Sequence, residues 1–136
     1  MRSFMLNKLI RDRVLIAMQE LGQHVTYHRL SDKDFLPELK RKLLEEANEL
    51  DLADKEAGKE LADLLEVIDQ MRAELHIEPA DLQELQQERR QKRGGFNDRI
   101  YVERVDLADD DPWAAYYAKE PDRFPEVKPK KGNKYG

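Results

Sequence analysis

The sequence predicts an all-α protein: a helical bundle built around an antiparallel helix hairpin, with a short extended segment and an extended C-terminal tail. Apolar residues recur at the spacing of an α-helix in several long segments, and capping residues, glycines or prolines separate these segments. Charged residues make up 39% of the 136 residues. Core positions must therefore be few and must lie along one stripe of each helix.

The first predicted helix runs from residue 4 to residue 21, and Gly22 ends it as a C-cap glycine would. The segment that follows, QHVTYHRL, is rich in β-branched and aromatic residues. Such a composition predicts a short extended strand over residues 23–30.

A second helix begins near Ser31 or Asp32, because either residue can cap it. Pro37 is expected in its first turn, since a proline deeper inside would break the hydrogen-bond ladder. The apolar stripe of this helix consists of Leu36, Leu39, Leu43, Ala47 and Leu50. After the interrupting stretch DLADKEAGK, the stripe of the third helix consists of Leu61, Leu64, Leu65, Ile68, Met71 and Leu75.

A polar helix completes the predicted helical domain over residues 1–105. The turn HIEPAD places Pro79 as the first residue of this helix, where proline is well tolerated. The helix stops at Gly94–Gly95, and the following segment FNDRIYVERV is expected to form a terminal strand or an extended arm.

Residues 106–136 differ in composition from the helical domain. They are rich in Pro, Asp and Lys, but they also carry Trp113, Tyr116, Tyr117 and Phe124. Disordered tails are usually poor in aromatic residues. We therefore expect this extension to pack on the helical core or on a neighbouring subunit, with only its last basic residues free.

The overall charge and the lack of cysteine argue against several classes of function. Lys and Arg number 24 against 29 Asp and Glu, so the net charge is −5, whereas general nucleic-acid binding needs a basic face. Without cysteine there is no disulfide, thiolate nucleophile or zinc–thiolate site. No apolar run approaches the roughly 20 residues of a membrane helix, and the first residues lack the apolar core of a signal peptide. The sequence predicts a soluble cytoplasmic protein with no nucleic-acid or membrane partner.

Two pairs of acidic residues lie on matching flanks of the second and third helices. On a helical wheel of about 100° per residue, Glu46 falls about 60° and Glu49 about 120° from the centre of their stripe, on one side. In the third helix Glu60 falls about 70° and Asp63 about 130° from the stripe centre, on the same flank. Glu45 lies roughly opposite its stripe, in water.

The break between these helices decides whether the acidic pairs can meet. In one continuous helix Glu46 and Glu60 would lie about 21 Å apart, too far to share an ion. Asp51 and Asp54 are capping residues and Gly58 weakens a helix, so the chain is expected to reverse there. The leucine stripes then face each other, and the carboxylate pairs converge.

Four converging carboxylates repel one another unless a cation neutralises them. Their hard, all-oxygen ligand set suits Mg²⁺, or alternatively Mn²⁺, rather than Zn²⁺. Magnesium usually binds substrate phosphates alongside carboxylates, so the pattern predicts phosphate-ester or phosphoanhydride chemistry in which the metal activates water. The alternative is a solvated acidic face, because charged residues are mostly exposed.

The acidic motif resembles that of a known family. EEANE, residues 45–49, followed by ELAD, residues 60–63, reproduces the EExxE…ExxD motif of the all-α nucleoside triphosphate pyrophosphohydrolases, which include MazG and phosphoribosyl-ATP pyrophosphohydrolase. The flanking segments NKLIRDRV and RQKRGGFNDRIYVE resemble the small MazG-like, phosphoribosyl-ATP pyrophosphohydrolase-like branch. The resemblance covers residues 6–103.

This resemblance implies a homodimer or homotetramer that hydrolyses a nucleoside triphosphate between its α- and β-phosphates with Mg²⁺. The family's metal ligands fall on Glu46, Glu49, Glu60 and Asp63, the four residues that the wheel selects. The resemblance further implies that Glu45 orients or activates water, although the wheel places this residue outside the site. These five acids are the candidate catalytic residues.

An acidic protein must supply cations locally to hold a triphosphate. On the first helix, Lys8 and Arg11 are candidates for contacts to the phosphates. Asn7 or Asp12 beside them is a candidate for reading the sugar or the base. The alternative for these positions is surface salt bridging along a helix.

A second set of candidate substrate-binding residues stands at the end of the polar helix: Lys92, Arg93 and Gly94. A glycine lets the backbone approach a phosphate closely. A basic cluster at a helix C-terminus also suits the helix dipole, and that interpretation needs no ligand.

The sequence leaves two classes of function open. The leading one is a Mg²⁺-dependent nucleoside triphosphate pyrophosphohydrolase that releases a nucleoside monophosphate and pyrophosphate and cleanses the nucleotide pool. Within the enzyme class, hydrolysis of phosphoribosyl-ATP in histidine synthesis is an alternative. The second class is a non-enzymatic helical interaction module whose aromatic tail is the contact surface.

Overall fold

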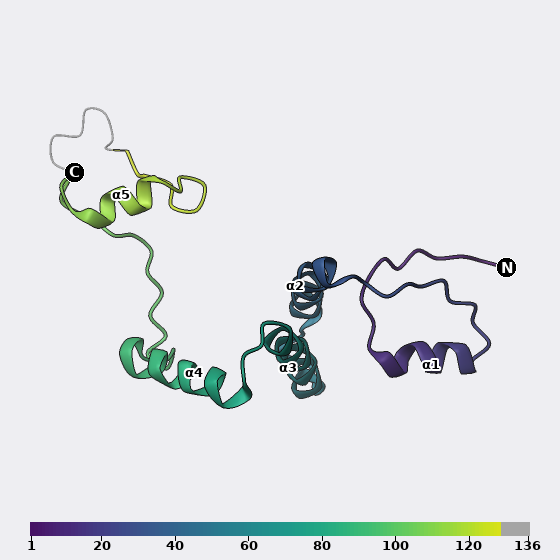
Figure 1. Cartoon of the computed structure of the whole chain (residues 1–136). Helices are drawn as coiled ribbons and strands as arrows, with labels where there is room; N and C mark the ends of the chain where they lie inside the picture. The colour runs from purple at the N-terminus through teal and green to yellow at the C-terminus, as the bar shows by residue number, and fades with distance from the viewer. Residues whose placement is uncertain (129–136) are drawn as a thin grey trace. The chain divides into compact units, whose positions relative to one another are not determined.

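The computed structural model describes residues 1–128, which contain five helices and no β-strand (Figure 1). The helices are α1 (Asp12–Glu20), α2 (Asp32–Glu49), α3 (Ala57–Glu74), α4 (Pro79–Arg93) and α5 (Pro112–Ala118). The predicted all-α class is confirmed for this part of the chain. None of these helices is long and apolar enough to cross a membrane. The chain divides into two compact units, Met1–Gly94 and Gly95–Gly136.

Helices α2 and α3 form a hairpin in the first unit. They lie side by side (Figure 1), and among the described helices they are the only pair that packs extensively. Two aspartates shape the connection: Asp51 Oδ1 accepts from the Ala53 N–H at 3.0 Å, and Asp54 Oδ1 accepts from the Glu56 N–H at 3.1 Å. These side chains offer the backbone an alternative to helical hydrogen bonds. The helix therefore ends and the chain reverses direction where the sequence predicts.

The interface of the hairpin is narrow. Leu39 on α2 and Val67 on α3 are the only buried apolar residues among those described, 5% and 9% exposed. Leu43, Leu64 and Met71 are half-buried. Full burial of an aliphatic side chain contributes about 1.5–3 kcal/mol, so an isolated hairpin with two such residues has only modest stability.

The sequence predicts that the apolar stripe of α3 packs against α2, but most of this stripe is exposed. Its exposed members are Leu61 (49%), Leu65 (65%), Ile68 (39%) and Leu75 (53%). Val67, which the predicted stripe omits, is the buried residue of α3. The centre of Leu64 and Val67 lies roughly 110° around the helix from the centre of Leu61 and Leu65. The edge of the predicted stripe nearest Val67, with Leu64 and Met71, is half-buried, and the side with Leu61 and Leu65 stays uncovered within the described unit.

The prediction of a first helix from residue 4 is wrong, because α1 begins only at Asp12. Residues 1–11 form an irregular segment. Asn7 has a φ of +48°, a left-handed conformation that asparagine tolerates but that cannot continue a right-handed helix. The end of the helix is as predicted, since Gly22 follows it with a φ of +78°.

Two expectations around the start of α2 are also wrong. Residues 23–30 form no strand, because no segment of the described chain pairs with them. Residues 96–105 form no strand either, which leaves the extended arm, the other alternative for that segment. Ser31 is the N-cap of α2, but Pro37 lies in the second turn of the helix rather than the first. A proline there removes the hydrogen bond to the carbonyl four residues earlier and crowds that carbonyl, yet the helix continues through Pro37 to Glu49.

Helix α4 has the predicted limits. It begins with Pro79 and ends at Arg93. Gly94 follows with a φ of +79°, a value that glycine adopts without steric cost.

The second unit contains an ordered aromatic cluster. Asp111 caps α5 by accepting a hydrogen bond from the Trp113 N–H at 2.9 Å. The rings of the cluster have neighbouring centroids 5.0–6.3 Å apart and belong to Trp113, Tyr116, Tyr117 and Phe124. The packing of residues 106–136 on the core or on a neighbouring subunit stays a prediction, and the last basic residues, Lys130, Lys131 and Lys134, lie outside the described residues.

Candidate functional site

Three carboxylates gather on the last turns of α2. One oxygen each from Glu45, Glu46 and Glu49 lies within 4.8 Å of the other two. Helical spacing places Glu49 beside the other two, because it lies four residues from Glu45 and three from Glu46. Glu45 and Glu46 are adjacent in sequence, and Lys42 Nζ lies between their carboxylates. The last turn of α2 carries no basic residue, although the C-terminal end of a helix dipole favours cations. Lys8 and Lys42 neutralise part of the negative charge of this cluster, and a bound cation would relieve the repulsion that remains.

The helical wheel places Glu45 in water, and this prediction is wrong, because its side chain is partly buried. Its side chain is 26% exposed, and Oε1 accepts hydrogen bonds from Lys8 Nζ at 3.2 Å and Lys42 Nζ at 3.4 Å. The wheel measures only the distance from the apolar stripe and ignores the N-terminal segment. Partial burial alone would raise the pKa of Glu45, but the hydrogen bonds and charges of both lysines outweigh it and hold this pKa below its ordinary value.

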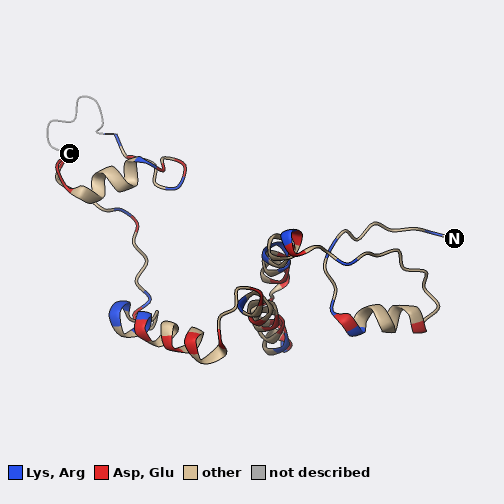
Figure 2. Ribbon diagram, viewed as in Figure 1, with Lys and Arg blue, Asp and Glu red and all other residues tan. Residues whose placement is uncertain are grey.

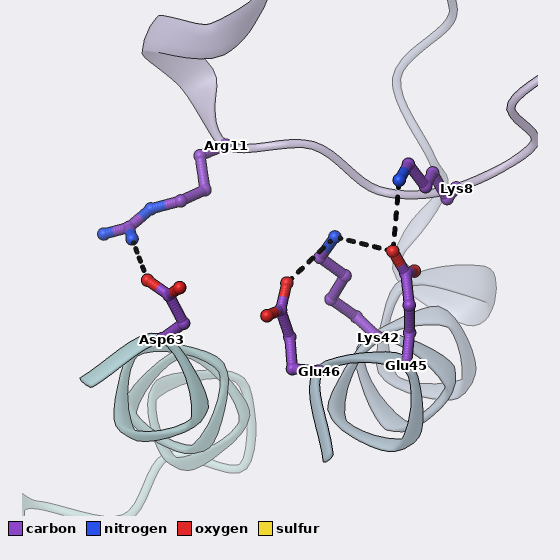
Figure 3. Close-up of polar contacts among 6 residues, drawn as sticks. All are labelled: Lys8, Arg11, Lys42, Glu45, Glu46 and Asp63. Carbon is purple, nitrogen blue, oxygen red and sulfur yellow. Dashed lines mark hydrogen bonds and ion pairs between the residues drawn. The ribbon is translucent and has the colours of Figure 1, made fainter. Parts of the chain in front are cut away.

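Lys42 is a residue of this site that the sequence interpretation missed. Its side chain is only 15% exposed, and Nζ lies 3.4 Å from Glu45 Oε1 and 3.3 Å from Glu46 Oε1. Figure 3 shows the ammonium group between the two carboxylates. The spacing of three and four residues along one helix was a signal that could have found this residue.

The acids of α3 have other partners. Asp63 Oδ1 accepts a hydrogen bond from Arg11 Nη1 at 3.1 Å, and Glu66 Oε2 lies 4.0 Å from Arg11 Nη2. Glu60 Oε2 accepts from the backbone N–H of Asp51 at 2.8 Å, so this side chain ties the connecting loop to α3. Neither Glu60 nor Asp63 belongs to the three-carboxylate cluster found among the described residues. The convergence of all four predicted ligands stays a prediction.

The N-terminal segment brings two predicted cations to both helices of the hairpin. Lys8 contacts Glu45 on α2, and Arg11 contacts Asp63 on α3 (Figure 3). Asn7 and Lys8 also line a hollow of about 240 Å³ between this segment and α2. Asp12, in contrast, lies exposed at the start of α1. Two of the predicted phosphate-binding residues, Lys8 and Arg11, therefore form ion pairs with acidic residues of the hairpin.

The second predicted cationic set lies on another helix. Lys92 and Arg93 occupy the last turn of α4, and Gly94 follows. Figure 2 shows basic residues in blue at this end of the helix. Within the described residues, α4 does not pack extensively on α2 or α3. The helix dipole accounts for the position of these cations without a ligand, and their contact with substrate stays a prediction.

The donor atoms of the α2 cluster fit a hard divalent cation. All are carboxylate oxygens, which suit Mg²⁺ or Mn²⁺. Glu45 and Glu46 are half-buried and Glu49 is exposed, so water has access to the remaining coordination positions, as Mg²⁺ usually requires.

Comparison with protein-family models finds no match to this chain. Comparison with curated proteins finds no significant match, and comparison with solved structures finds none either. The MazG-like resemblance therefore rests on the sequence motifs alone.

Proposed function

We propose that the protein is a Mg²⁺-dependent nucleoside triphosphate pyrophosphohydrolase that releases a nucleoside monophosphate and pyrophosphate, with a role in cleansing the nucleotide pool in the cytoplasm. One observation carries this proposal: the cations of the N-terminal segment contact carboxylates on both helices of the hairpin, Lys8 at Glu45 of α2 and Arg11 at Asp63 of α3. Carboxylates hold a hard cation, and ammonium or guanidinium groups hold phosphate oxygens. A metal-bound triphosphate needs both kinds of group.

The acids divide into two roles in this proposal. Glu46 and Glu49 hold the cation from α2, and Glu60 and Asp63 complete its ligands from α3. Mg²⁺ bound there neutralises charge on the phosphates and lowers the pKa of the attacking water. Glu45 has a pKa below its ordinary value, so it is ionised at neutral pH and can accept a hydrogen bond from that water.

The cations can move from carboxylate to phosphate at low cost. The side chains of Lys8 and Arg11 are 40% and 60% exposed in their ion pairs. Such exposed pairs typically contribute about 0.2–1 kcal/mol. A triphosphate carries more negative charge than one carboxylate and accepts several charge-assisted hydrogen bonds, so both side chains are available to hold substrate.

A homo-oligomer belongs to the same proposal. The exposed face of α3 includes Leu61, Leu65 and Ile68, and Leu44 on α2 is 57% exposed. A narrow hairpin with so much uncovered apolar surface gains stability by burying it against a second copy. A homodimer or homotetramer accounts for this face.

The decisive experiment measures pyrophosphate release from a panel of nucleoside triphosphates and phosphoribosyl-ATP, with and without Mg²⁺. Glu49→Gln removes one cluster carboxylate, and Glu84→Gln on α4 makes the same charge change elsewhere. We expect Mg²⁺-dependent release by the wild type and by Glu84→Gln, and none by Glu49→Gln. Release that persists in Glu49→Gln, or that needs no metal, contradicts the proposal. Preference for phosphoribosyl-ATP would favour the histidine-synthesis alternative.

The non-enzymatic interaction module is the second candidate, and the aromatic cluster of the second unit favours it. Trp113 is 60% exposed and Tyr116 is 43% exposed, and aromatic residues are enriched at protein interfaces. No pyrophosphate release from any substrate, together with no thermal shift on adding Mg²⁺, would assign the chain to this class.

A further inference from the structure

The acidic cluster of α2 has an internal cation. Lys42 Nζ lies 3.3 Å from Glu46 Oε1 and 3.4 Å from Glu45 Oε1. Lys8 supplies a second ammonium group to the same Glu45 oxygen at 3.2 Å. An ammonium group between two carboxylates competes with a divalent cation for them, because the two cations repel each other and each is attracted to the same negative charges.

Lys42 differs from Lys8 in how it is held. Its side chain is 15% exposed, against 40% for Lys8, and it stems from the same helix as the acids. The Lys42 ammonium can therefore reach the cluster whatever conformation the N-terminal segment adopts. Lys42 also lines the hollow beneath Asn7 and Lys8, so its ammonium has a space beside the cluster into which it can turn.

We propose that Lys42 is a positioning residue of the acidic site: it is the counterion of Glu45 and Glu46 in the cation-free protein and yields them to a divalent cation. The ammonium then turns into the hollow beside Lys8, where it contacts phosphate oxygens of the substrate. This inference rests on the proposed function. It predicts that Lys42 raises the concentration of divalent cation needed to fill the site. It also predicts that substrate binds more tightly once the cation is bound, because the Lys42 ammonium is then available to contact phosphate.

Binding of Mn²⁺ alone, measured from the paramagnetic resonance of the free ion, tests the exchange without any turnover. Lys42→Gln removes the ammonium, Lys42→Arg retains a cation, and Lys40→Gln makes the same change of net charge at an exposed position of the same helix. We expect Lys42→Gln to bind Mn²⁺ about tenfold more tightly than Lys40→Gln, because two competing ion pairs are lost. Lys42→Arg should bind Mn²⁺ like the wild type.

The second measurement is the KM for the best triphosphate at saturating Mn²⁺. Lys42→Gln should raise KM while Lys40→Gln leaves it unchanged. A purely structural lysine would not tighten Mn²⁺ binding when removed, and circular dichroism confirms that each variant retains its helices.

The outcomes separate this inference from the proposed function. Equal Mn²⁺ affinity of Lys42→Gln and Lys40→Gln, with metal-dependent pyrophosphate release intact, overturns the role of Lys42 and leaves the enzyme standing. Weaker Mn²⁺ binding by Lys42→Gln also overturns it, since the lysine would then assist the cation. No Mn²⁺ binding by the wild type or any variant overturns both the inference and the proposed metal site.

Discussion

Removing one carboxylate from the α2 cluster should stabilise the protein. Glu49 has two carboxylate neighbours within 4.8 Å. At that separation each repulsion amounts to about 0.9 kcal/mol in a water-like dielectric, and Lys8 and Lys42 offset part of it. Glu49 also ends α2, where a negative charge opposes the helix dipole by about 0.3–1 kcal/mol. We expect Glu49→Gln to raise the free energy of unfolding by about 1 kcal/mol at low salt.

The assay is urea unfolding followed by circular dichroism, at low and high ionic strength and with Mg²⁺. Salt screens repulsion between exposed charges, so the advantage of Glu49→Gln should shrink at high salt. Mg²⁺ at ten times its Kd should stabilise the wild type by about 1.4 kcal/mol and the variant much less. Glu84→Gln on α4 is the matched control. A lower free energy of unfolding for Glu49→Gln than for the wild type at low salt would refute this prediction. Equal stabilisation of the wild type and Glu49→Gln by Mg²⁺ would refute it as well.

Three further predictions concern pH, the core and the exposed face. The pKa of Glu45 is lowered in the folded state. The stability that this carboxylate contributes is therefore complete above the ordinary glutamate pKa and is lost as the pH falls through the folded-state pKa. The difference in free energy of unfolding between wild type and Glu45→Gln, measured by urea unfolding, should shrink between about pH 7 and pH 3. Leu39→Ala should lower the free energy of unfolding by about 2–3 kcal/mol in the same assay, because Leu39 is 5% exposed. Leu65→Asp should reduce the mass measured by light scattering to that of the monomer, and an unchanged mass would remove this face from the interface.

Where each helix starts and stops follows largely from neighbours along the chain. Asp51 and Asp54 interrupt the helix between α2 and α3, because each accepts a hydrogen bond from the backbone N–H two residues ahead. Gly94 ends α4 with a positive φ, and Pro79 begins it. Such signals are local, so a sequence contains them in full. The prediction for residues 4–11 failed because apolar periodicity does not reveal the left-handed backbone of Asn7.

The position of Glu49 beside Glu45 and Glu46 was determined by the sequence itself, because Glu49 lies four and three residues from them on one helix. Only the tertiary structure decided which side of α3 is buried, since Val67, outside the predicted stripe, is 9% exposed and Leu65, within it, is 65% exposed. It also decided the partners of the predicted cations. Lys8 and Glu45 are 37 residues apart, and Arg11 and Asp63 are 52 apart. Contacts over such separations depend on how the chain folds back, which no local periodicity records.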